Sequence, residues 1–152
     1  MLWTTLTSAK LESVMSTTEM AMAQRAVSLT TPDRTPQILA NLIAEIRGMI
    51  ATWSPNTLSA DTTLIPPSFV ARALVLARGR VLSGLPSYSQ DEARKKEMED
   101  AEAFFLLVAK GTIRPEPAAD AVTNPVPSEK PSGVEIISAP GSRTGRTRMD
   151  GI

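Results

Sequence analysis

The chain contains neither cysteine nor histidine among its 152 residues. The lack of cysteine excludes disulfides and thiol chemistry, and the lack of histidine excludes imidazole general-base catalysis and the commonest zinc sites. Neither sign of charge predominates, because 16 Lys and Arg residues balance 16 Asp and Glu residues. A bulk attraction to nucleic acid or membrane is therefore not expected, and any charge-driven role must be local.

Long apolar runs are also missing. No stretch approaches the roughly 20 apolar residues of a membrane-spanning helix. The N-terminus, Met1 to Thr5, lacks the basic region and apolar run of a signal peptide. We expect a soluble protein that is made in the cytoplasm and has no membrane partner.

The segment from Pro66 to Gly111 carries the strongest helix signals. A proline pair opens a first helix, which is apolar nearly all round and ends at Gly84 to Pro86, so we expect it to be central. A second helix begins at Ser89 to Glu92, which has the pattern of a capping box, and ends at Lys110 and Gly111. Its inward stripe comprises Met98, Ala101, Phe104, Phe105 and Val108.

Leu106 and Leu107 fall outside that inward stripe. Two adjacent leucines with no place in the core of their own subunit predict contact with another subunit or partner.

Three further helices are predicted upstream. The clearest runs from Thr35, as its cap, through Pro36 to Trp53 and is amphipathic. Before it, one short helix begins at Thr7 or Ser8, and another begins at the Ser16 to Glu19 capping box. No convincing strand alternation precedes residue 112. The sequence thus predicts an all-α fold, a small bundle of four to five helices, with an N-terminal helical arm (1–34) and a helical core (35–114).

The composition changes after residue 114, and residues 115–152 hold half of the twelve prolines. Such sequence cannot bury enough apolar area to offset its ordering entropy, so we expect an extended C-terminal arm. Its apolar segment is suited to add a short β-strand to a partner's sheet, and its arginines are suited to an acidic surface or phosphates. These candidate partner-binding residues are Val134, Ile136, Ile137, Arg143, Arg146 and Arg148.

The sequence carries no recognisable catalytic motif. The four carboxylates that cluster between Glu97 and Glu102 lie on the polar flank of an exposed helix, where a solvated face is the favoured interpretation over a metal or glycosidase site. No nucleophile elbow or phosphate-binding glycine motif is present. Arg72, Arg78 and Arg80 point in three directions about their helix, which favours arginines that snorkel at its rim over a phosphate-tracking stripe. We predict no enzyme activity and no cofactor.

The order of features from Thr35 to Pro117 resembles a known family. An amphipathic helix that ends in Trp53 is followed by the loop sequence Ile-Pro-Pro-Ser and by the helix Ala-Arg-Ala-Leu-Val-Leu-Ala-Arg-Gly-Arg-Val-Leu. After a polar turn comes Lys-Lys-Glu-Met-Glu-Asp-Ala-Glu-Ala-Phe-Phe-Leu-Leu-Val-Ala-Lys-Gly. This order is similar to that of the tailed-phage head-tail connector proteins, also called head completion or adaptor proteins, and in particular to the phage Mu-like prophage branch. The counterparts of the family pattern are Arg78, Arg80, Leu82, Leu85, Glu99-Asp100-Ala101, Phe104 to Leu107 and Gly111.

The resemblance implies a virion structural protein at the head-tail interface. It would form a ring of twelve copies below the portal protein, extend the DNA channel and dock the next neck or tail-completion protein. Arg47 and Arg72 are the candidates for channel-facing positions, and phage DNA would pass without sequence-specific contacts. The alternative is a small helical nucleic-acid-binding regulator that uses the Arg-rich tail.

Overall fold

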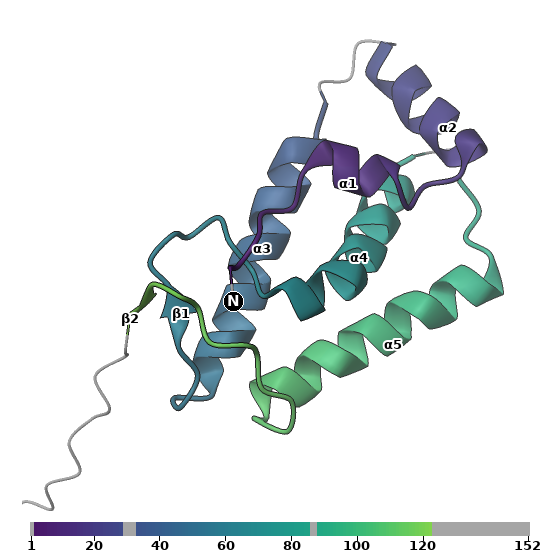
Figure 1. Ribbon diagram of the computed structural model, residues 1–152. Coiled ribbons are helices and arrows are strands. Elements are labelled where there is room, and N and C mark those ends of the chain that lie inside the picture. The colour runs from purple at the N-terminus through teal and green to yellow at the C-terminus, as the bar shows by residue number, and fades with distance from the viewer. Residues whose placement is uncertain (1, 29–32, 86–87, 123–152) are drawn as a thin grey trace, which may run out of the picture.

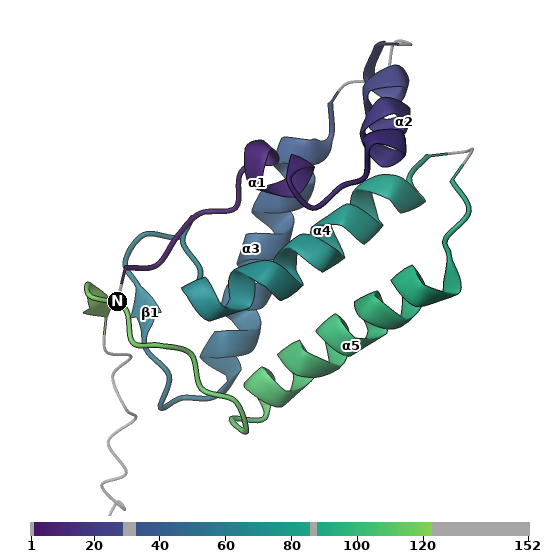
Figure 2. The ribbon, with the colours of Figure 1, turned by 45° about the vertical axis from the view of Figure 1, so that its right-hand side comes forward.

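The computed structural model describes residues 2–28, 33–85 and 88–122. Three long helices form its body: α3 (Thr35–Thr52), α4 (Val70–Ser83) and α5 (Glu92–Ala109), and each packs against the other two (Figures 1 and 2). The short helix α1 (Ser8–Glu12) contacts α3 and α4, and α2 (Thr17–Ser28) contacts α4. A turn of 3-10 helix, η1 (Pro67–Phe69), leads into α4. The predicted all-α fold is confirmed.

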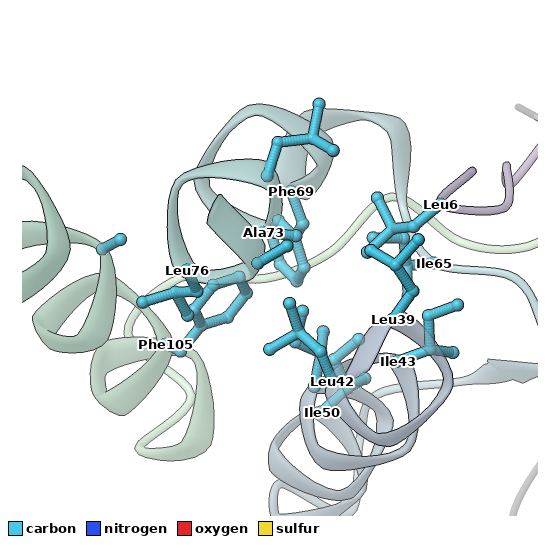
Figure 3. Packing of buried hydrophobic residues seen from close by; sticks show 14 of the residues in the cluster. Leu6, Leu39, Leu42, Ile43, Ile50, Ile65, Phe69, Ala73, Leu76 and Phe105 are labelled. Carbon is cyan, nitrogen blue, oxygen red and sulfur yellow. The ribbon is translucent and has the colours of Figure 1, made fainter. Parts of the chain in front are cut away.

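The core lies between the long helices, where their apolar stripes meet. Figure 3 shows Leu39, Leu42, Ile43 and Ile50 of α3 facing Phe69 of η1 and Ala73 and Leu76 of α4, with Phe105 of α5 beside them. The central place predicted for the Pro66–Pro86 helix agrees with six buried residues on α4. These are Ala73, Leu74, Leu76, Ala77, Arg78 and Leu82.

Two of the predicted helix starts are confirmed by hydrogen bonds. Thr7 caps α1, because its side chain accepts a hydrogen bond from the amide of Lys10 at 3.3 Å. Ser16 and Glu19 form the predicted capping box at α2: the Glu19 carboxylate accepts from the Ser16 amide at 2.7 Å, and the Ser16 hydroxyl accepts from the Glu19 amide at 3.2 Å.

Two other predicted caps are wrong. Thr35 is the first residue of α3 and not its cap, and its amide donates to the side chain of Asp33 at 2.8 Å. The predicted capping box at Ser89 does not form, because α5 begins at Glu92 after Asp91. Glu92 is thus in the first helical position instead of the third, which is where a capping-box glutamate must stand.

The predicted end of α5 at Lys110 and Gly111 is confirmed in detail. The Gly111 amide donates to the Val108 carbonyl at 2.9 Å, and the Thr112 amide donates to the Leu107 carbonyl at 3.0 Å. This is the paired pattern of a Schellman motif, which needs a left-handed residue. Gly111 has a φ of 74°, and a Cβ there would overlap the ring of Trp53. Both the turn and the close approach of α3 therefore require glycine.

A two-residue antiparallel pairing was not predicted. Strand β1 (Leu58–Ser59) pairs with β2 (Ala121–Val122), in the register Leu58 opposite Val122. Two residues are too few to show the alternation by which a strand is recognised in sequence. The pairing ties the segment after α5 to the loop before α4.

Packing continues across both predicted boundaries of the helical core, the one after residue 34 and the one after residue 114. Trp3, Leu6 and Leu11, within the predicted arm 1–34, are buried in the common core. Beyond residue 114, Ala118 is buried as well. The described parts of both flanks therefore lie on their own subunit.

Candidate interaction surface

The two leucines predicted to lie outside the core are exposed. Leu106 is 56% and Leu107 is 40% exposed, and with Leu2 they are the large exposed hydrophobic residues in the part of the chain that the structure describes. They are consecutive residues in the last turns of α5, and this exposed apolar pair is called here the Leu106–Leu107 patch. Its contact with another subunit stays a prediction.

An aromatic cluster holds this end of α5 in place. All three phenylalanines of the chain meet edge to face, with centroid separations of 5.3 Å for Phe69 and Phe104, 5.8 Å for Phe69 and Phe105, and 5.4 Å for Phe104 and Phe105. Such edge-to-face pairs contribute about 0.5–1.5 kcal/mol each beyond the burial of their area. The patch is therefore presented on a rigid helix end that is tied to the start of α4.

Arg72 is exposed and joins the same region. Its guanidinium carbon lies 4.2 Å from the centroid of the Phe104 ring, a cation–π contact between α4 and α5. The side chain is thus positioned on the surface rather than free to rotate. Its predicted place on a channel wall stays a prediction.

Arg47, the other candidate for a channel wall, binds within its own subunit. Its guanidinium donates to the carbonyl of Leu64 at 2.9 Å and to that of Ser59 at 2.8 Å, and it lies 5.8 Å from the Trp3 ring centroid. Burial lowers the pKa of Arg47, while Asp61 and Asp120 act in the opposite direction. Its donors fix the loop between α3 and α4, a role that the sequence did not indicate.

The other two arginines of α4 form ion pairs to different helices. Arg80 pairs with Glu45 of α3 at 2.7 Å. Arg78 pairs with Glu97 of α5 at 2.7 Å and also donates to the Val14 carbonyl at 3.3 Å. The prediction of a snorkelling side chain is wrong for Arg78, because the side chain is only 6% exposed. Its hydrogen bonds satisfy the guanidinium inside the interface between α4 and α5.

The carboxylates between Glu97 and Glu102 do not converge. Glu97, Glu99, Asp100 and Glu102 are all exposed, and the described segments contain no group of three or more Asp or Glu residues placed to hold a metal ion. Of the four, Glu97 is the one that forms ion pairs with other described residues, and hydrogen bonds from Arg78 and then Arg94 lower its pKa. The arrangement is that of a structural ion pair beside a solvated helix face.

Polar contacts hold the segment after α5, called here the C-terminal latch (residues 115–122). The Glu116 carbonyl accepts from the indole of Trp3 at 2.9 Å, and its carboxylate accepts from Ser68 at 2.6 Å. Asp120 accepts from the Ser59 hydroxyl at 2.8 Å and the Ala60 amide at 3.1 Å. The Ser59 hydrogen bond is the main cause of the lowered pKa of Asp120. The sequence did not predict these contacts, because isolated polar residues in a proline-containing stretch form no recognisable motif.

The predicted sites of the C-terminal arm lie outside the described residues. These are Val134, Ile136, Ile137, Arg143, Arg146 and Arg148. Within the described ranges, no helix combines the length and the apolar character needed to cross a bilayer.

Comparison of the chain with models of protein families, with curated proteins and with solved structures finds no match.

Proposed function

We propose that the protein is a head-tail connector of a tailed phage, which forms a ring below the portal, extends the DNA channel and docks the next neck or tail protein. The observation that carries the proposal is the Leu106–Leu107 patch within the segment that resembles the connector family. Full burial of a leucine side chain is worth roughly 1.5–3 kcal/mol. Two adjacent exposed leucines on a rigid helix end therefore favour a protein that associates.

The surroundings of the patch support an assembly role over a catalytic one. Two of the arginines that carry the resemblance serve packing between helices, because Arg78 pairs with a carboxylate of α5 and Arg80 pairs with one of α3. Exposed carboxylates on α5 face solvent without converging. In this subunit the arginines of α4 hold helices together, and exposed leucines lie at the end of α5. These are properties that a ring component needs.

The balanced charge supports the same proposal, since a channel must let DNA slide without gripping it. The runner-up, a nucleic-acid-binding regulator, rests on the arginines after residue 142 alone. Duplex binding with a salt dependence that corresponds to about three phosphate contacts would favour that regulator.

The test is mass spectrometry and electron microscopy of phage particles purified from a lysate of cells that carry the gene. We expect the chain in the particles at one copy per portal subunit. Absence from particles would overturn the proposal. In complemented particles, Leu107→Asp should reduce incorporation strongly, whereas Ala103→Asp, an equal charge at another exposed α5 position, should reduce it less.

The part played by residues beyond the C-terminal latch can be tested separately. A chain that ends at Val122 keeps every described contact of the latch, in contrast to one that ends at residue 114. If the arm grips a neighbour or the portal, the chain that ends at Val122 should fold normally but assemble poorly. Normal heads with normal tails would rule out that role for the arm.

A further inference from the structure

A second apolar feature lies on α3, away from the Leu106–Leu107 patch. It is a groove of about 480 Å³ between the N-terminal segment, the first half of α3 and the loop before η1. Its lining includes the buried side chains of Leu6, Leu39 and Ile43, with Thr62 and Thr63 at the loop side. The groove is referred to below as the α3 groove.

The patch of a subunit cannot fill the groove of that same subunit. The end of α5 lies against the end of α3, because Gly111 packs on the ring of Trp53. The groove is lined by α3 residues from Pro36 to Ala44. At 1.5 Å per residue, the 13 positions from Ala40 to Trp53 correspond to roughly 20 Å along the helix. In Figure 1, α1 crosses one end of α3 and α5 ends near the other.

We propose that the Leu106–Leu107 patch of one subunit seats in the α3 groove of the next. The inference rests on the self-assembly in the proposed function and specifies the contact by which the ring closes. The partner of the groove is thus a second copy of this chain.

The sizes of the two features agree. An apolar cavity of roughly 150 Å³ accepts a benzene-sized molecule, so a groove of about three times that volume accommodates two leucine side chains. The buried leucine and isoleucine side chains in the lining would complete their packing with those of the patch. The threonine side chains beside them can remain in contact with water.

Charge at the edges of both features is complementary. Lys110 is exposed three residues beyond Leu107, and its ammonium forms none of the ion pairs found among the described residues. Asp61 is exposed next to Thr62 at the edge of the groove. An approach of the helix end toward the loop brings these opposite charges together, which gives the contact an orientation.

The contact joins two different surfaces, so it is heterologous. Each subunit that gives its patch to one neighbour still offers its groove to another. Such contacts propagate and close into a ring when the rotation allows, whereas a contact of the patch with itself would stop at a dimer. This distinction makes the proposal directly testable.

Engineered disulfides supply the test, since the chain has no cysteine of its own. The pair Leu107→Cys and Ala40→Cys places one thiol on the patch and one in the groove, at two exposed positions. After mild oxidation, non-reducing electrophoresis of the concentrated protein and of particles should show a ladder of covalent trimers and larger species. The matched control combines Leu107→Cys with Asn41→Cys, the exposed neighbour of Ala40 that does not line the groove, and should give at most a small fraction of that ladder.

Every other outcome overturns either the contact or the proposed function. If Leu107→Cys alone forms covalent dimers as efficiently as the double variant forms its ladder, the contact is between two patches. No ladder above the control, in a pair variant with a native circular dichroism spectrum, would indicate that the groove holds something else. A ladder from a chain that is absent from particles would leave the contact standing and refute the connector function. Presence in particles without a ladder would support the connector function and refute the contact.

Discussion

The two segments that flank the three-helix body are held to it by different forces. On the N-terminal side, Trp3, Leu6 and Leu11 are at most 6% exposed and belong to the common core. On the C-terminal side, the latch buries Ala118 and packs Ala121 partly against the core, and it is otherwise held by hydrogen bonds and by the two-residue pairing of β1 with β2. Apolar burial contributes roughly 25 cal/mol per Å², whereas a hydrogen bond replaces one that the group would make with water and contributes only about 0.5–1.5 kcal/mol net.

This contrast implies that the flanks differ in how readily they leave the body. The N-terminal flank should unfold only with the whole domain, because it shares the core. The C-terminal latch should open at a much lower free energy, since few buried apolar contacts oppose its release. In an assembling protein, the latch is thus the flank that can change partners.

The largest expected effect is from Leu11→Ala. Leu11 is 2% exposed, so the truncation leaves a cavity and should cost about 2–5 kcal/mol in the free energy of unfolding. Urea denaturation followed by circular dichroism measures it. Leu2→Ala is the control: its side chain is 81% exposed, and the change should lie within about 0.5 kcal/mol. Equal effects from both would show that the N-terminal flank is no part of the core.

Gly111→Ala tests the joint at which the latch leaves α5. A left-handed conformation costs a non-glycine residue about 1–3 kcal/mol, and contact with the Trp53 ring adds strain, so we expect a loss of about 2–4 kcal/mol in stability. The control is Gly48→Ala in the middle of α3, where a Cβ meets nothing within 4 Å. That change should raise stability by about 0.5–1 kcal/mol. An unchanged stability in Gly111→Ala would contradict the described helix end.

Much of the body was predictable because its signals are local or periodic. The α3 stripe, the Ser16 capping box and the glycine end of α5 each follow from residues within a few positions of one another. The exposure of Leu106 and Leu107 followed from the same helical period. The cap at Ser89 failed because the pattern does not specify where the helix starts, and two residues of displacement remove both of its hydrogen bonds.

Other features depend on residues that are far apart in sequence. The Arg78 guanidinium is buried because Val14 and Glu97 converge on it from two other segments. The latch depends on Trp3 meeting Glu116, which is 113 positions away. The α3 groove is lined by three separate segments, none of which carries a binding motif. A single sequence shows the residues on each side of such a contact, but it does not show that they are close in space.

Trp3→Phe separates the two kinds of force at one residue, because the ring belongs to the N-terminal core and the indole N–H holds the latch. The variant leaves the Glu116 carbonyl without its donor. Trp53→Phe removes the same atoms, but the Trp53 indole nitrogen is buried without an acceptor among the described residues. Trp3→Phe should therefore cost about 1 kcal/mol more than Trp53→Phe in urea denaturation. A larger loss at Trp53 would show that the Trp3 hydrogen bond does not stabilise the fold.

The smallest effect should come from Asp120→Asn, and it should depend on pH. Because Ser59 and the Ala60 amide lower the pKa of Asp120 below its ordinary 3.8, the folded state binds this proton more weakly than the unfolded state does. The contribution of Asp120 to stability is therefore fully present well above pH 3.8 and is lost as the pH falls through the lowered value. The native protein should have the higher urea midpoint at pH 7, and the difference from Asp120→Asn should shrink toward pH 3. Asp100→Asn, on the exposed face of α5, is the control and should leave the urea midpoint at pH 7 close to that of the native protein. A difference that persists unchanged in acid would mean that the latch is held by something other than the Asp120 carboxylate.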